Sequence, residues 1–347
     1  MYLLSLQTAL PPKFFPQEAS WEAFRESATA RRLRGRSVSL VEKLLRRNNG
    51  IDGRHFALLP LEDIFERDAE SLNRGFEAVA PPLGARALAA ALDSAGLAAG
   101  DVDALIVCTC TGYLCPGLSS FIAEQAGLRG DAGLFDLAGL GCGAAIPSLR
   151  LAAGLAAADP EARIGVIALE VCSAAFYMDD DPGVLISACL FGDGAAAVIV
   201  SGTPGQGAAW QFSGFRSLHL PENRQDLRFE NSGGKLRNRL HRSVPQTAAA
   251  AVKTLEAGFR ASNPGRNPRY ITHGGGKDVL DALEPVVGQA LPEARAVLRE
   301  AGNMSSPSVL FALRRYLDGE AGADDLRLIS FGAGFSAHAC SLRRGGA

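Results

Sequence analysis

The sequence is poor in the residues that metal sites and disulfide frameworks require. Its 347 residues include 5 histidines and 7 cysteines, and neither type gathers at the spacing of a metal-binding motif. An odd number of cysteines, placed mostly in apolar segments, argues against a secreted disulfide framework and favours a reducing compartment. We therefore expect no metal site and a cytoplasmic protein.

Strong net charge and long apolar runs are also missing. The formal net charge is −2, so no global positive field attracts nucleic acid or an anionic membrane. No apolar run reaches the roughly 20 residues of a membrane span. The apolar start, residues 1–6, has no basic flank and soon meets Pro11 and Pro12, which favours a first strand over a signal peptide. Any anionic ligand must be met by local groups.

What the sequence does contain is an alternation of strand-like and helix-like segments. Hydrophobic residues make up 47% and charged residues 21%, as in ordinary globular proteins. The length allows one large domain or two fused halves. Apolar runs such as 101–109 and 164–169 predict strands buried on both faces. The main predicted helices are 17–49, 81–97, 244–259 and 278–291, and the polar segment 204–242 predicts a long connection or hairpins.

One cysteine stands between glycines, in the run Gly141-Cys142-Gly143, where an apolar strand-like run gives way to an alanine-rich helix. Pro147 is tolerated in a first helical turn, so the helix is expected to begin near Ala144, just after the cysteine. A helix N-terminus favours a thiolate and can lower the pKa of a cysteine. The alternative is an inert buried cysteine, and this segment alone does not decide between them.

A faint internal repeat links this cysteine to two other residues. Cys142 follows Thr111 by 31 positions, and Asn303 follows His273 by 30. Two similar half-domains would bring Cys142, His273 and Asn303 toward one pseudo-twofold axis. A nucleophilic cysteine needs a base or an electropositive setting, and acyl transfer needs hydrogen-bond donors for the oxyanion, which His273 and Asn303 could supply.

Five motifs of the chain are glycine-containing and occur in a fixed order: Leu140-Gly-Cys142-Gly-Ala-Ala, Leu190-Phe-Gly-Asp-Gly-Ala-Ala-Ala197, His273-Gly-Gly, Gly302-Asn-Met-Ser-Ser306 and Phe331-Gly-Ala-Gly334. Together they resemble the motifs of type III polyketide synthases, the family of chalcone and stilbene synthases, over nearly the whole chain. The resemblance implies an α/β thiolase fold, a duplicated five-layer αβαβα arrangement, and a homodimer. The two halves would be residues 1–204 and 205–347.

The resemblance also implies roles for individual residues. Cys142 would carry the growing acyl chain, His273 would keep the thiolate and assist decarboxylation of malonyl-CoA, and Asn303 would help His273 hold the thioester oxyanion. Phe191 matches a gatekeeper between the coenzyme A tunnel and the cavity, and Cys115 falls near the dimer interface and the partner's cavity. The other expected pocket residues are Cys110, Ser305, Asn238 and Gly332; the candidates for the coenzyme A phosphates are Lys43, Arg46, Arg47, Arg54 and Lys277.

Two features of the sequence depart from the family pattern. Prolines are replaced in His273-Gly274-Gly275 and by Ala333, so both loops are expected to be looser. Asn238 stands where plant enzymes have a second gatekeeper phenylalanine. Because this loss would widen the cavity, we expect an aliphatic acyl starter and an alkylpyrone or alkylresorcinol product.

The expected reaction is iterative decarboxylative condensation of malonyl-CoA onto an acyl-CoA starter, followed by cyclisation to a pyrone or resorcinol-type product. The CoA thioesters are substrates, and no cofactor is expected. Two alternatives stay open. One is a ketosynthase or acyltransferase of the same fold that depends on a carrier protein. The other is a cysteine hydrolase of papain type, which shares the cysteine, histidine and asparagine. Similarly, Lys43, Arg46 and Arg47 could simply form a solvated helix face.

Overall fold

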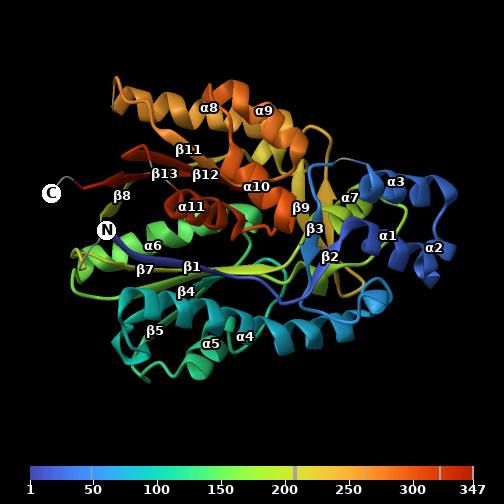
Figure 1. Ribbon diagram of the computed structural model, residues 1–347, viewed down its shortest axis with the longest axis horizontal. Coiled ribbons are helices and arrows are strands. Elements are labelled where there is room, and N and C mark those ends of the chain that lie inside the picture. Colours follow the sequence, from blue (N-terminus) through green and yellow to red (C-terminus); the bar gives the residue numbers. More distant parts are fainter. Residues whose placement is uncertain (48, 206–208, 263, 320–321, 346–347) are drawn as a thin grey trace.

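The computed structural model describes residues 1–47, 49–205, 209–262, 264–319 and 322–345. Five layers stack on one another (Figure 1). Helices α8 (Val244–Ser262) and α9 (Lys277–Val287) cover one outer face, and α4 (Ala69–Ala95) and α5 (Leu118–Ala126) cover the other. Between two layers of strands lie α6 (Ala145–Ala158) and α11 (Ser308–Asp318). The five-layer arrangement expected from the sequence is confirmed.

The strands belong to one nine-stranded sheet with the order β11-β12-β13-β8-β1-β7-β6-β4-β5. On each side, a parallel pair is followed by two antiparallel neighbours: β4, β6, β7 and β1 in one half, and β11, β12, β13 and β8 in the other. The halves meet where Tyr2 and Leu3 of β1 pair with Gln211 and Trp210 of β8. The strands are β1 (Tyr2–Ala9), β4 (Ala104–Cys108), β5 (Gly133–Leu137), β6 (Ile164–Glu170), β7 (Gly194–Ser201), β8 (Trp210–His219), β11 (Arg269–Thr272), β12 (Asp325–Gly332) and β13 (Ser336–Arg344).

The central strands are buried on both faces because helices cover them from both sides. Every residue of β4 and β6 is buried, which explains why these strands read as continuous apolar runs. The first turns of α6 pack Ile146 and Leu149 into the core between the two layers of strands. Ala152 and Ala156 continue this buried face, whereas Gly154, Ala157 and Ala158 are exposed, so only one face of the second half of α6 is buried.

Two sequence predictions are wrong in detail, and one helix was not predicted. Pro81 and Pro82 lie inside α4 instead of opening a helix, because packing against β1, β6 and β7 offsets the backbone hydrogen bonds that prolines remove. The segment after α9 forms a further helix, α10 (Pro292–Ala301). Residues 17–49 contain three short helices, α1 (Gln17–Glu26), α2 (Ala28–Arg32) and α3 (Gly35–Arg46), and not a single long one.

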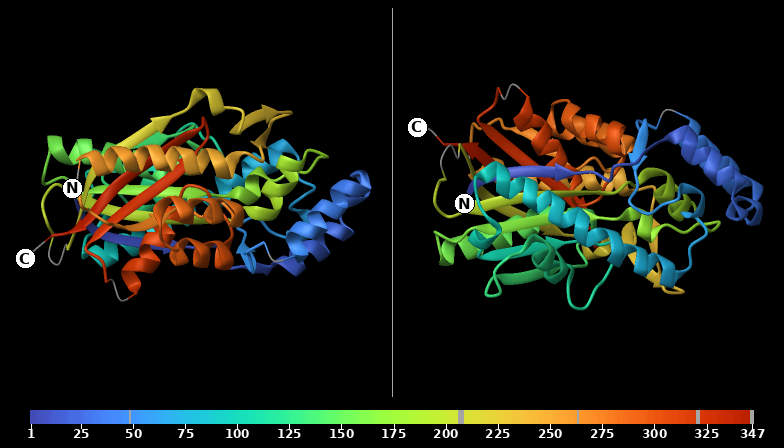
Figure 2. Two further views of the ribbon diagram at one scale, coloured as in Figure 1. Left: turned by 90° about the horizontal axis from the view of Figure 1, so that it is seen from above. Right: turned by 60° about the horizontal axis from the view of Figure 1, so that its bottom comes forward.

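A group of smaller elements gathers at one end of the layers, on the right in Figure 1. Figure 2 shows α1, α2 and α3 projecting there in both views. The polar segment forms the long strand β8 and then a hairpin of β9 (Leu227–Ser232) and β10 (Lys235–Leu240), so hairpin formation was predicted and β8 was not. The remaining elements at this end are α7 (Pro182–Leu190), β2 (Phe14–Pro16) and β3 (Gly53–His55). No helix in the described part of the chain is long and apolar enough to cross a membrane.

Candidate active site

Cys142 lies in a short 3-10 turn, Gly141–Gly143, directly before α6. Its side chain is buried, with 5% exposed. The backbone of Gly332, at the end of β12, passes very close to this turn: a Cβ atom at Gly332 would lie 2.4 Å from the carbonyl oxygen of Leu140 and 2.5 Å from the amide nitrogen of Gly143. The expected position of the cysteine at the start of a helix is confirmed, and only glycine fits opposite it.

Ser305 is the nearest polar neighbour of the cysteine. Its Oγ donates a hydrogen bond to Cys142 Sγ across 3.1 Å. Ser305 has a φ of 61°, in the left-handed region that non-glycine residues seldom adopt. Its amide donates to Asn303 Oδ1 at 2.8 Å, which helps to hold the turn. The strained backbone therefore aims this hydroxyl at the sulfur.

Asn303 connects its own loop with the loops around Gly275 and Phe191. Its side-chain Nδ2 donates to the carbonyl oxygen of Gly275 at 3.3 Å. Its backbone pairs with the strand-like run around Phe191, since its amide donates to Leu190 O and its carbonyl accepts from the Gly192 amide, both at 3.0 Å. The two halves of the fold thus meet here, and Asn303 joins the gatekeeper segment to the His273 loop.

His273 follows β11 and is 1% exposed. Its ring packs edge-on against Phe331, with 5.1 Å between ring centroids. Its Nδ1 has no hydrogen-bond partner among the described residues. Burial lowers the pKa of His273 to about 3, so the imidazole is neutral near pH 7 and one of its ring nitrogens is free to act on a substrate.

The electrostatics of Cys142 differ from the expectation. Burial raises the pKa of Cys142 to about 12, although the hydrogen bond from Ser305 opposes the rise. Nearby Glu170 also disfavours a second negative charge. The predicted preference of Cys142 for a thiolate is therefore not supported, because desolvation outweighs the effect of the helix N-terminus. A thiolate must form together with a compensating positive charge.

Glu170 is a functional candidate that sequence reasoning missed. It ends the otherwise apolar strand β6 and is fully buried. Its carboxyl group accepts hydrogen bonds from the Cys110 amide at 2.9 Å and from Ser306 Oγ at 2.7 Å, and it lies 3.3 Å from Ser305 Oγ as an alternative acceptor to Cys142 Sγ. Burial raises its pKa. The sequence signal that could have identified Glu170 is a single acidic residue at the end of a buried strand, because a buried charge needs hydrogen-bond partners.

Next to this cluster lies a small cavity of about 30 Å³. A cavity needs about 10–15 Å³ to hold one water molecule, so this one is narrow. The widening expected at Asn238 stays a prediction: Asn238 lines the cavity, and three aromatic side chains line it too. The lining includes Phe191, Cys110, Ser305 and Asn238, as predicted, together with Phe176, Tyr177 and Phe229.

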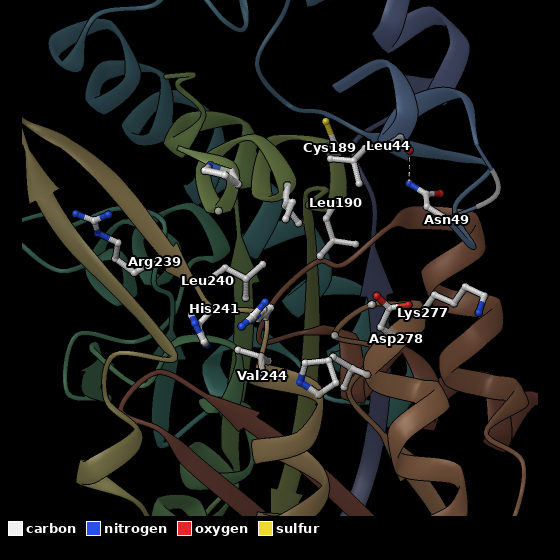
Figure 3. Close-up of a pocket in the computed structure, with 18 of the residues that line it drawn as sticks. Leu44, Asn49, Cys189, Leu190, Arg239, Leu240, His241, Val244, Lys277 and Asp278 are labelled. Carbon is white, nitrogen blue, oxygen red and sulfur yellow. Dashed lines mark hydrogen bonds between the residues drawn. The ribbon is translucent and has the colours of Figure 1, made fainter. Parts of the chain in front are cut away.

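A larger pocket of about 880 Å³ opens beside it (Figure 3). Figure 3 shows the hairpin residues Arg239 and Leu240 on one side and Lys277 and Asp278 on the other. Leu190 and Gly275 line this pocket, and both accept hydrogen bonds from Asn303. Phe191 follows Leu190 and lines the small cavity, so it stands between the two spaces, as expected of a gatekeeper.

Of the five candidates for the coenzyme A phosphates, Lys277 lines this pocket. The prediction for Arg54 is wrong. Its guanidinium is fully buried and donates to the carbonyl oxygens of Ala188 at 2.6 Å and Phe191 at 2.9 Å, so it holds α7 instead of reaching solvent. Lys43, Arg46 and Arg47 are exposed on α3 or at its end. The pocket also has cationic groups that were not predicted, namely Arg228, Arg239 and Arg242, and it is lined by His241 as well.

Cys115 and Gly332 have different surroundings. Cys115 is exposed and lines a third hollow of about 1110 Å³, which also contacts Cys110 and Phe229. Gly332 shapes the cysteine turn and is not among the residues that line the small cavity. Among the described residues, no group of three or more histidine, cysteine or acidic side chains is placed to hold a metal ion.

The buried cysteine, histidine and asparagine between the halves of the five-layer fold are the residue types that acyl transfer through a thioester needs. Comparison with known proteins agrees: a family model for FAE1/type III polyketide synthase-like proteins matches residues 1–229. The chain belongs to the type III polyketide synthase family. It is therefore a CoA-dependent enzyme that condenses malonyl-CoA onto an acyl-CoA starter by repeated decarboxylation and then cyclises the chain.

Two bacterial relatives illustrate the similarity. The chain is 34% identical over 303 residues to a 1,3,6,8-tetrahydroxynaphthalene synthase of Streptomyces coelicolor, covering 84% of this chain and 79% of the relative. It is 32% identical over 290 residues to a 3,5-dihydroxyphenylacetyl-CoA synthase of Streptomyces toyocaensis, covering 78% and 74%. These alignments argue against the papain-type hydrolase.

Solved structures show the same fold. The crystal structure of the S. coelicolor tetrahydroxynaphthalene synthase superimposes with a TM-score of 0.84 at 30% identity, covering 100% of both chains. A polyketide synthase from the brown alga Ectocarpus siliculosus superimposes with a TM-score of 0.91 at 21% identity, covering 99% of this chain and 98% of the other. The duplicated thiolase fold is thereby confirmed.

Proposed function

We propose that this enzyme starts from a small acyl-CoA, such as malonyl-CoA or acetyl-CoA, and makes a compact polyhydroxylated aromatic product. The observation that carries this proposal is the cavity of about 30 Å³ lined by Ser305, whose Oγ hydrogen-bonds to Cys142 Sγ. A space of this size with aromatic walls disfavours a long aliphatic starter. The names of the relatives, which include a phloroglucinol synthase of Pseudomonas fluorescens, support a small phenolic product.

In the loading step, the Cys142 thiol attacks the thioester carbonyl of the starter, and the C–S bond to coenzyme A breaks. His273 takes the thiol proton during the attack and returns it to the leaving thiolate. Both groups are neutral beforehand, since burial raises the pKa of Cys142 and lowers that of His273. The ion pair forms only when each charge can stabilise the other.

In the extension step, malonyl-CoA binds and its carboxylate leaves as carbon dioxide. The electron pair moves onto the thioester, whose oxygen becomes negative. His273 and the Asn303 amide donate hydrogen bonds to that oxygen. The Asn303 bond to Gly275 is long, at 3.3 Å, so the amide can turn to the substrate. The enolate carbon then attacks the acyl group on Cys142, and the thiolate leaves.

Coenzyme A would enter through the pocket of about 880 Å³. Arg242, His241 and Lys277 line it and could meet the phosphates. The nearby exposed side chains of Lys43, Arg46 and Arg47 would meet phosphate groups outside the pocket, because Leu44 of the same helix lines its edge. Arg46 is the weakest of these, since it already pairs with Glu18 and Glu42.

The surface near β5 supports a homodimer. β5 is the last strand of the sheet, so one of its edges is free to pair. Leu134 and Phe135 of this strand are 40% and 37% exposed, and Tyr113 in the neighbouring loop is 82% exposed. A second copy that covers this edge would bury these side chains and approach Cys115. A cytoplasmic location and a division into halves near residue 204 stay predictions.

Incubation with labelled malonyl-CoA, with and without added acyl-CoA and without carrier protein, tests the proposal. We expect carbon dioxide release and an aromatic product from malonyl-CoA alone or with acetyl-CoA, also in the presence of a metal chelator. Cys142→Ala should abolish product, Cys142→Gln should still decarboxylate malonyl-CoA, and His273→Ala should lose both reactions. A strict need for carrier protein, or a preference for long acyl-CoA, would contradict the proposal.

A further inference from the structure

Asn238 is a polar residue that the structure turns into the small cavity. It lies on β10, opposite Phe229 of β9 in the hairpin, and it is 5% exposed. Its neighbours Arg237 and Arg239 both pair with Asp181, each at 2.9 Å. The hairpin therefore carries its charges on one side and places the asparagine amide in the cavity on the other.

The hydrogen bonds around Asn238 fix the orientation of its amide. Ser187 Oγ donates its one hydrogen to the carbonyl oxygen of Gly183 at 2.7 Å. It can then only accept from the asparagine, which donates through Nδ2 at 2.7 Å. The other amide atom, Oδ1, is buried and has no hydrogen-bond partner among the described residues. The Asn238 atom without a partner is therefore a hydrogen-bond acceptor.

A second unpaired polar atom lines the same cavity. Tyr177 Oη is buried and likewise lacks a partner in the described part of the chain. Burial and nearby Asp179 raise the pKa of Tyr177 to about 12, so the hydroxyl keeps its proton near pH 7 and can donate. The cavity therefore presents one acceptor and one donor that the protein itself does not satisfy.

Unpaired buried polar atoms are unfavourable and rare, and at a binding site they indicate a ligand with the complementary groups. The ligand needed here carries a hydroxyl near a carbonyl, within a chain attached at the other end. Cys110 and Ser305 line the cavity beside the nucleophile, so the attached end lies at Cys142. The complementary groups lie further along the chain.

We propose that Asn238 Oδ1 and Tyr177 Oη bind an enolised β-dicarbonyl unit of the growing polyketide, an inference that rests on the proposed function. When such a unit enolises, a proton moves from the methylene carbon to one oxygen, which leaves a hydroxyl next to a carbonyl. Asn238 accepts from the hydroxyl, and Tyr177 donates to the carbonyl. The pair holds the far end of the chain while further malonyl units are added at the sulfur.

Two variants of one residue test this directly. Asn238→Leu and Asn238→Asp both remove the amide that donates to Ser187, but only the leucine variant removes the acceptor. With malonyl-CoA as substrate, Asn238→Leu should shift the product ratio from the longest product to shorter lactones by about tenfold, as expected for one lost hydrogen bond. Asn238→Asp should shift it much less. Tyr177→Phe, which removes only the hydroxyl, should shift it in the same direction as leucine.

The control is Ser232→Ala, an exposed position on the same hairpin, which should keep the wild-type ratio. An equal shift in both Asn238 variants would show that the bond to Ser187 matters and would overturn the inference. An unchanged product ratio in both Asn238→Leu and Tyr177→Phe, measured under conditions in which the wild type makes product, would also overturn the inference. If the wild type releases no carbon dioxide from malonyl-CoA, the proposed function itself fails, which is a distinct result.

Discussion

Ser305 Oγ lies 3.1 Å from Cys142 Sγ, although these two residues come from different halves of the fold. The serine hydroxyl has one hydrogen, and Glu170 Oε1 lies 3.3 Å away as a second acceptor. When the thiolate forms, its charge draws this hydrogen more strongly than the neutral thiol does. Ser305 therefore stabilises the reactive form of the nucleophile.

Removing this hydroxyl should make Cys142 less reactive. A hydrogen bond to a charged group contributes about 1.5–3 kcal/mol, so its loss should raise the thiol pKa further and slow alkylation at pH 8 by about tenfold or more. Ser305→Gly and Ser305→Ala both lack the hydroxyl, but glycine adopts the φ of 61° without strain. Iodoacetamide labelling followed by mass spectrometry measures the rate, and wild-type rates in both variants would contradict the role.

The close approach of Gly332 to the cysteine turn makes it intolerant of any side chain. Gly332→Ala would place Cβ 2.4 Å from a backbone oxygen, so the turn must shift, and we expect a large loss of product formation and a lower melting temperature. Gly154→Ala is the matched control, because nothing lies within 4 Å of that Cβ. In helix α6 it should stabilise by about 0.5–1 kcal/mol. Thermal unfolding and product assays report both effects.

Phe229 lies between the small cavity and the hollow of about 1110 Å³ and is the aromatic residue that lines both, together with Cys110, Thr111 and Leu236. Phe229→Ala should join the two spaces and admit longer acyl chains. In steady-state kinetics with starters from acetyl-CoA to palmitoyl-CoA, the preferred starter should become longer. The ratio of kcat/KM values for starters that differ by one methylene should change by about 10–200-fold, the range that a hydrophobic pocket gives. A chain-length profile identical to the wild type would mean that another group closes the cavity.

The cations of the coenzyme A pocket should affect substrate binding more than turnover. Lys277→Ala and Arg242→Ala are expected to raise KM for acyl-CoA severalfold with little change in kcat, because they touch a part of the substrate that does not react. Arg46→Ala with Arg47→Ala should have a smaller effect of the same kind. Arg25→Ala, at an exposed arginine on α1, is the control. An unchanged KM in the Lys277 and Arg242 variants would remove these residues from the site.

Buried His338 should make the fold sensitive to acid. Burial, with Arg150 and His219 nearby, lowers its pKa from 6.5 to about 4. As the pH falls below 6.5, the unfolded chain binds a proton that the folded protein accepts only near pH 4, so stability decreases across this window, by up to about 3 kcal/mol. His338→Gln and His338→Asn should both flatten this part of the curve. Urea unfolding from pH 7 to 4 measures it, and equal slopes in wild type and variants would disprove it.

The sequence predicted the fold where one physical signal dominates. The strands β4 and β6 were predicted within a few residues, because apolar runs flanked by polar turns are hard to misread. The start of α4 was missed, since Pro81 and Pro82 suggest a helix start and only packing against the sheet shows a helix interior. Tertiary contacts override such local rules.

The sequence predicted those site residues that lie in distinctive loops. It assigned the wrong role to residues whose role depends on their surroundings in the fold. Cys142, Ser305 and Asn303 share one hydrogen-bonded cluster, as their motifs suggested. Arg54 is as basic as any surface arginine in the sequence, and nothing there shows that β3 places it under the carbonyl groups of α7. The pKa of Cys142 likewise depends on desolvation, which no short motif contains.

The repeated sheet order has a consequence for how the enzyme can be assembled. Cys142 stands before α6 in one half, and Asn303 stands before α11 in the other, so neither half contains a complete reaction centre. If the chain were cut between Ser201 and Trp210, each fragment alone would be inert toward malonyl-CoA, and mixing them would restore turnover only when the two parts of the sheet rejoin along β1 and β8. In such a complementation experiment, turnover of malonyl-CoA would therefore appear only in mixtures in which the two halves have associated.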